Sequence, residues 1–137
     1  MKTEPRMDGP GHLLKATTAL AAGHLMLTGG FPDEAGRSAY MAAFHAALAL
    51  IVVVTGKEPK THNGTHSEFA RVVRERSDIS HDLVAFLSNT YQMTSVADYA
   101  SADPVTPVEA SAALETAKDF LSTITAIIAP PHPHSSQ

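Results

Sequence analysis

The stretch from residue 32 to residue 54, PDEAGRSAYMAAFHAALALIVVV, decides the fold. Pro32 is followed by two acidic residues, which favours a helix start because carboxylates stabilise the positive N-terminal end of the helix dipole. The second half is apolar on nearly every side, so we expect a central, buried helix that ends at Thr55-Gly56. The β-branched run from Ile51 to Val54 is typical of a strand. The whole segment is too long and too rich in alanine for one.

Segments with helical spacing of apolar residues lie on both sides of this stretch. Gly29-Gly30 ends the segment before it, and the residues Thr106-Pro107-Val108-Glu109 open the last one with a capping sequence. The predicted flanking helices are Leu13 to Thr28, Thr65 to Arg74, His81 to about Val96, and a final helix from Pro107 to about residue 129.

These helices predict an all-α domain, an antiparallel up-and-down bundle of four to five helices, because short links favour antiparallel neighbours. The chain has 137 residues and 44% apolar residues, which fits one domain with its own core. We expect a disordered tail at 1–8, the bundle at 9–129, and a Pro/His tail at 130–137 that cannot continue a helix.

Composition narrows the function classes. The net charge is -4, so the whole molecule lacks the basic surface that nucleic-acid-binding proteins usually show. The absence of cysteine and of an apolar stretch near the N-terminus favours a cytoplasmic protein without a signal peptide. The longest apolar run, Ala39 to Val54, contains His45 and is shorter than the roughly 20 residues of a membrane span, so we expect no membrane association.

The central segment also carries a family resemblance. Gly36-Arg37-Ser38-Ala39-Tyr40-Met41-Ala42-Ala43-Phe44-His45-Ala46-Ala47 resembles the signature helix of HEPN-domain proteins, in particular the small stand-alone bacterial branch. The likeness continues through Thr55-Gly56-Lys57, Lys60 to Gly64, Ser67 to Arg71 and Ala97-Asp98-Tyr99, and it covers roughly residues 12 to 128.

This resemblance implies a helical bundle that is usually a homodimer and is often paired with a minimal nucleotidyltransferase as toxin and antitoxin. Active toxins of this kind are metal-independent ribonucleases with an Arg, four to six residues, and then a His. The Arg neutralises the scissile phosphate while the His moves protons to or from the ribose 2′-hydroxyl. The resemblance implies no cofactor and no metal.

The sequence departs from that pattern at the expected place, because Thr94 to Tyr99 contains neither Arg nor His. Arg76 and His81 have four residues between them but lie at a predicted turn. Arg37 and His45 have seven between them, which on a helix gives about 80° of rotation and about 12 Å along the axis, so both side chains can line one groove. The catalytic residues therefore stay unknown, with the candidates His45, Arg37, Arg76 and His81.

Each candidate ligand-binding residue also has a possible structural role. His45 is either a core histidine bonded to a neighbouring polar group or part of a ligand cleft. Arg37 is either a ligand contact or the partner of Asp33 or Glu34 in a surface salt bridge. Asp98 and Tyr99 occupy positions where the family usually places functional polar residues. The predicted ligand-binding set is Arg37, Tyr40, His45, His62, Asp98 and Tyr99.

His62 and His66 are four residues apart, which on a helix would present both rings to one metal ion. Asn63-Gly64 between them is expected to break the helix, and the sequence offers no obvious third ligand. We therefore expect these histidines to cap and pack a loop, and we expect no metal site.

The sequence predicts an HEPN-like domain that binds RNA or a nucleotide, or acts as the toxin component beside a nucleotidyltransferase partner. One alternative is a metal-independent endoribonuclease with a displaced Arg/His set. Another is a structural subunit that docks a second protein.

Overall fold

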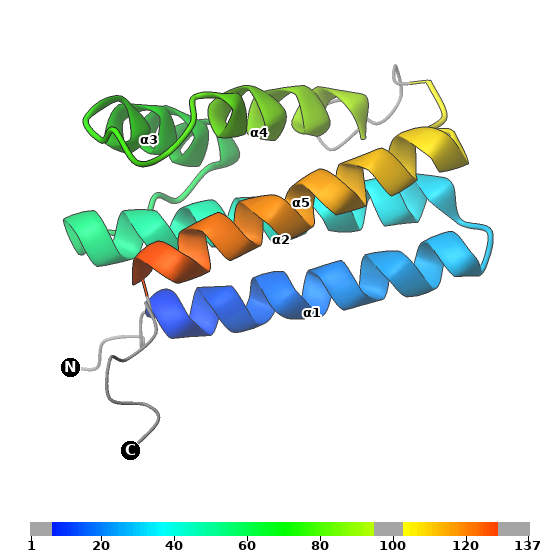
Figure 1. The fold of residues 1–137 in the computed structure, drawn as a ribbon, viewed down its shortest axis with the longest axis horizontal. Helices are drawn as coiled ribbons and strands as arrows, with labels where there is room; N and C mark the ends of the chain where they lie inside the picture. The colour runs from blue at the N-terminus through cyan, green and yellow to red at the C-terminus, as the bar shows by residue number, and fades with distance from the viewer. Residues whose placement is uncertain (1–6, 95–102, 129–137) are drawn as a thin grey trace.

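The computed structural model describes residues 7–94 and 103–128, and these residues form five α-helices. The all-α bundle predicted from the sequence is confirmed. In Figure 1, α2 and α5 lie side by side in the middle, with α1 on one side and α3 and α4 on the other. The helices α1, α2, α4 and α5 alternate in direction along the chain. The helices are α1 (Gly9–Thr28), α2 (Pro32–Thr55), α3 (His62–Arg74), α4 (Asp82–Met93) and α5 (Pro107–Ile128).

The centre of the bundle is α2, as its apolar sequence predicts. Its alanines at 35, 39, 42, 43, 46, 47 and 49 are all fully buried. Such small side chains let neighbouring backbones approach closely, and both α1 and α5 contact α2 extensively. By length and composition alone α2 is long and apolar enough to cross a membrane. However, 56% of its most apolar 18-residue stretch is buried inside the bundle.

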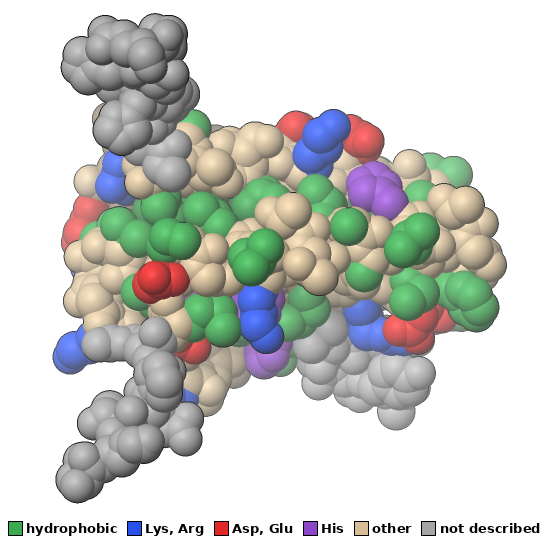
Figure 2. Space-filling model, turned by 90° about the horizontal axis from the view of Figure 1, so that it is seen from below, with side chains coloured by type: hydrophobic (Ala, Val, Ile, Leu, Met, Phe, Trp, Pro, Cys, Tyr) green, Lys and Arg blue, Asp and Glu red, His purple; other side chains and the backbone are tan. Residues whose placement is uncertain are grey.

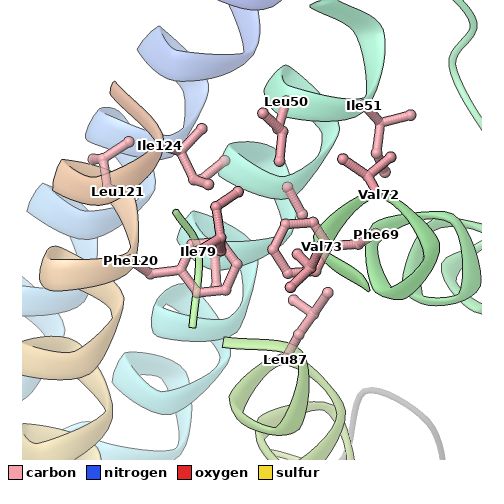
Figure 3. Close-up of a cluster of buried hydrophobic side chains, with 14 of the residues drawn as sticks. Leu50, Ile51, Phe69, Val72, Val73, Ile79, Leu87, Phe120, Leu121 and Ile124 are labelled. Carbon is pink, nitrogen blue, oxygen red and sulfur yellow. The ribbon is translucent and has the colours of Figure 1, made fainter. Parts of the chain in front are cut away.

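Buried hydrophobic side chains form two clusters. In the larger one, Phe69 of α3 stacks on Phe120 of α5 with ring centroids 5.3 Å apart (Figure 3). Ala16 of α1, Leu50 of α2 and Leu87 of α4 belong to the same cluster, so all five helices meet there. The smaller cluster joins the first half of α2 to α5 through alanines and Leu114. The predicted apolar stripe of α5 is therefore its buried face.

The start of α1 differs from the prediction, because the helix begins at Gly9 and not at Leu13. Asp8 caps it, with its carboxylate accepting a hydrogen bond from the Gly11 N–H at 2.8 Å. Pro10 lies in the first turn, where the missing N–H of proline costs nothing. The earlier start places His12 inside the helix, where it is 2% exposed.

The prediction that Asn63-Gly64 breaks the third helix is wrong. Helix α3 begins at His62, and the Thr61 hydroxyl caps it by accepting a hydrogen bond from the Gly64 N–H at 2.8 Å. A glycine in the first turn is tolerated because the cap offsets its low helix propensity.

The remaining helix ends follow local signals in the sequence. Gly56 ends α2 with a φ of 76°, the left-handed conformation that glycine adopts without strain. At the start of α5, Thr106 and Glu109 bond each other's backbone N–H groups, which is the predicted capping box. Helix α4 begins at Asp82, whose N–H donates to the Ser80 hydroxyl. It ends at Met93, before the predicted Val96, which lies outside the described residues.

Candidate functional site

Aromatic and histidine rings form a continuous row along one side of α2. Helix α2 contributes three rings to this row, the first turn of α1 adds one, the start of α3 adds two, and α4 adds one. Neighbouring ring centroids in the row are 4.5 to 5.9 Å apart. We call this surface, together with the carboxylate that joins it, the histidine face. Its residues are His12, Tyr40, Phe44, His45, Glu58, His62, His66 and Tyr91.

Tyr40 is the fully buried centre of one half of the histidine face. Its hydroxyl lies 2.7 Å from His62 Nδ1 and 2.8 Å from His66 Nε2. Because α3 starts at His62, the two histidines occupy successive turns and present both rings to this oxygen. They therefore pack against α2 and do not cap a loop, which corrects the role expected for them from the sequence.

The hydrogen bonds at Tyr40 require one histidine to donate and the other to accept, since a phenol has a single proton. Burial raises the pKa of Tyr40, and the neighbouring Tyr91 raises it further. Burial lowers the pKa of His62 and of His66, and His62 adds to the lowering at His66. The three groups are therefore neutral near pH 7 and join α2 to α3 without a net charge.

His45 is the centre of the other half of the histidine face. Its Nδ1 lies 3.1 Å from Nδ1 of the buried His12, and His12 Nε2 lies 3.1 Å from a carboxylate oxygen of Glu58. A carboxylate only accepts, so His12 Nε2 carries a proton and, in a neutral ring, His12 Nδ1 accepts. His45 must then donate from Nδ1, which leaves the lone pair on its Nε2. No described residue bonds that nitrogen.

The surroundings of His45 disfavour a charge on its ring. Burial lowers its pKa to about 4, and the nearby His12, Lys15 and His62 act in the same direction. Glu58 opposes this effect without overcoming it. The His45 ring is only partly buried, so a ligand can reach the unprotonated Nε2. This arrangement provides a neutral proton acceptor on which the charge of Lys15 acts.

The other candidate residues lie away from this hydrogen-bond network. Arg37 pairs with Glu34, the surface salt bridge considered from the sequence, and it also donates to the Thr94 carbonyl. Arg76 pairs with Asp78, with both bonds at 2.8 Å. His81 is exposed just before α4. Two further predicted residues, Asp98 and Tyr99, lie outside the described residues.

Among residues 7–94 and 103–128, no group of three or more histidine, aspartate or glutamate side chains is placed to hold a metal ion. A separate groove of about 350 Å³ lies between α4 and α5, with Phe86, Met93 and Ala113 among the residues that line it. Its lining contains one ionisable group, Glu109, so it offers little for acid–base chemistry.

The predicted ligand-binding set contains three members of the histidine face, Tyr40, His45 and His62. Two other members, His12 and Glu58, were not predicted to be site residues. Asp8 followed by Pro10 is a sequence pattern typical of a helix start. A helix predicted to begin there would have included His12. Glu58 lies in the polar connection between α2 and α3, and no local pattern indicates its contact with a residue 46 positions away.

A small antiparallel helical bundle with a histidine-lined face along its central helix is the class of protein that these features define. The sequence model of the HEPN domain matches residues 11–127 of the chain. The chain belongs to the HEPN domain family, and this membership indicates a function related to nucleotides or RNA. A comparison with curated proteins yields no significant match.

Replacing Tyr40 by Phe removes the shared hydroxyl and leaves the two α3 histidines without their common partner. We expect the free energy of unfolding to fall by about 1–3 kcal/mol, measured by urea denaturation. The matched control is Tyr91→Phe, since Tyr91 stacks on the same rings but its hydroxyl bonds none of the described residues. Equal effects of the two changes would contradict a structural role for the Tyr40 hydroxyl.

Stability should decrease in mild acid because of His45. The unfolded chain protonates this ring near pH 6.5, whereas the folded domain does so only near pH 4. The unfolded state therefore binds more protons between these values, so the free energy of unfolding falls as the pH drops from about 6.5 to about 4. We expect about 1–2 kcal/mol from His45 after allowing for its partial exposure.

Denaturation curves at several pH values test this dependence. His45→Gln should flatten it, whereas the change His24→Gln at an exposed position of α1 should leave it unchanged. The same pH slope in His45→Gln and in the native chain would contradict the assignment.

Proposed function

We propose that this HEPN domain binds RNA or a nucleotide on its histidine face, as the toxin or binding component of a pair with a nucleotidyltransferase-type partner. The observation that supports this proposal is a combination of three features at the histidine face: partly exposed rings, the lone pair on His45 Nε2, and the charge of Lys15 acting on His45. Partly exposed aromatic rings such as Phe44 and Tyr91 suit stacking with unpaired bases. A lysine beside them suits a phosphate group.

The partner part of the proposal rests on the family alone. A neighbouring reading frame with the glycine-serine and paired-aspartate motif of nucleotidyltransferases would support it, and an unrelated neighbour would weaken it.

A second candidate function, a metal-independent endoribonuclease, is favoured by the hydrogen bonds around His45. A neutral histidine with an accessible lone pair is suited to remove the proton of a ribose 2′-hydroxyl. The Arg part of the family motif has no counterpart among these contacts, because Arg37 and Arg76 each pair with a carboxylate. Lys15 is the cation whose charge acts on His45, so it would carry the phosphate contact.

An RNA-binding and cleavage assay in EDTA, with the native chain, His45→Ala and His81→Ala, tests both functions. We expect His45→Ala to weaken RNA binding several-fold, and to slow any cleavage by about 100-fold or more, the usual contribution of a general base. His81→Ala is the matched control because His81 is exposed and makes no contact with the histidine face.

Intact RNA throughout, with the protein folded and binding RNA, would rule out the ribonuclease. Absence of binding to RNA and to ribonucleoside monophosphates in the native chain would rule out the proposed function itself.

We further propose that the domain forms a homodimer through the outward face of α1. Leu14 and Leu25 on this face are 68% and 74% exposed, and Ala21 lies between them at helical spacing. Helix α1 carries one lysine and no carboxylate, so two copies can meet with little charge to desolvate. Figure 2 shows hydrophobic side chains spread over this side of the molecule, with few charged groups among them.

Light scattering after size-exclusion chromatography tests the dimer. The native chain should have the mass of two copies, and the double change Leu14→Glu and Leu25→Glu should give a single copy. Val108→Glu on α5 is the control, since Val108 is 79% exposed but lies on another helix. A dimer that persists in the double variant would contradict this choice of face.

A further inference from the structure

The hydrogen-bonded series from Glu58 through His12 to His45 has a property that a single buried histidine lacks. Each of its two links is 3.1 Å long, and each joins a ring nitrogen to the next group. The three groups come from three different parts of the chain: Glu58 from the polar connection after α2, His12 from the first turn of α1, and His45 from the middle of α2. The two imidazole rings are also stacked, with centroids 5.3 Å apart. Such a row of groups can pass a proton as well as hold one.

We propose that Glu58, His12 and His45 form a proton relay that accepts a proton from a ligand hydroxyl at His45 Nε2 and holds it on His12 beside Glu58. The ligand chemistry is a ribonucleotide hydroxyl next to a phosphate, and this part rests on the function proposed above.

Two proton transfers make up the relay. The ligand hydroxyl loses its proton to His45 Nε2 and becomes an alkoxide or, in a reaction, the attacking oxygen. His45 passes its own Nδ1 proton to His12 Nδ1 and is neutral again. His12 becomes an imidazolium whose Nε2–H still donates to the Glu58 carboxylate. One proton has moved from the ligand to His12, and the new positive charge lies beside a negative one.

The charges around His45 explain why the proton moves on. His12 and Lys15 of α1 and His62 of α3 all lower the pKa of His45, so a cation there is unfavourable. His12 is 2% exposed, but its Nε2 contacts a carboxylate that can pair with the cation. Glu58 is itself 34% exposed, so it retains contact with solvent while it pairs with His12. Neither His12 nor Glu58 is expected to touch the ligand, so both act as positioning residues for His45.

Ring-nitrogen NMR spectra of the native, full-length chain test the relay without any activity. At pH 7 the His45 ring should carry its proton on Nδ1 and none on Nε2. In Glu58→Gln the amide no longer fixes the His12 proton, so the His45 Nε2 signal should shift toward the protonated form. Glu75→Gln is the matched control, because the Glu75 carboxylate bonds Arg71 at the far end of α3 and no member of the histidine face. If Glu58→Gln does not fold, the native spectrum alone decides, and a His45 proton on Nε2 would overturn the relay.

A second measurement follows the ring signals as the pH is lowered. The His45 ring should stay neutral until the pH approaches 4. A His45 ring that becomes protonated near pH 6.5 would overturn the proposal.

The ligand is tested with ribonucleoside 3′-monophosphates and their 2′-deoxy counterparts as probes. The ribose form should bind about 3- to 10-fold more tightly, the usual effect of one hydrogen bond, and should shift the His45 Nε2 signal. This preference should be lost in His45→Gln and retained in Glu75→Gln. Equal binding of both sugars overturns the hydroxyl ligand, whereas a wrong His45 tautomer overturns the relay, so the two failures are distinguishable.

Discussion

Close packing against the alanines of α2 is the constraint on which the other features of this structure depend. Because seven of these side chains are fully buried methyl groups, α1 and α5 can both lie directly on α2. Gly23 of α1 serves the same approach, since a Cβ there would lie 2.6 Å from Leu114 of α5 and 3.1 Å from Ser38 of α2. Only with α1 this close can a histidine in its first turn reach the ring of His45.

The helices and their buried faces could be predicted from the sequence because each depends on local spacing. Phe120 and Ile124 repeat at the period of a helix, and both are fully buried. The helix starts were harder, because capping can override the low helix propensity of glycine. At Gly64 a threonine cap keeps the helix intact, and at Gly9 an aspartate cap does the same.

The site was only partly predictable for a different reason. Tyr40, His45 and His62 stand out in the sequence, since each is a polar aromatic residue in or beside an apolar helix. Their partners are set by tertiary structure: His45 bonds a residue 33 positions away, and the Tyr40 hydroxyl bonds residues 22 and 26 positions away. No periodicity in the chain encodes such contacts. The family resemblance did not supply them either, because it directs attention to an Arg and His motif that this chain lacks at the expected place.

The position of His12 near the N-terminal end of α1 links the chemistry of the site to local unfolding. Helix ends open far more often than the whole domain does, and for the start of a helix the free energy of that opening is set by the first turn and its N-cap. In α1 this turn is held by the Asp8 carboxylate and by the backbone bond from the His12 N–H to the Asp8 carbonyl, 3.0 Å long. Fraying of a single turn would withdraw one ring from the row while leaving the rest of the bundle intact. The N-terminal cap thus sets the fraction of molecules in which the histidine face is complete.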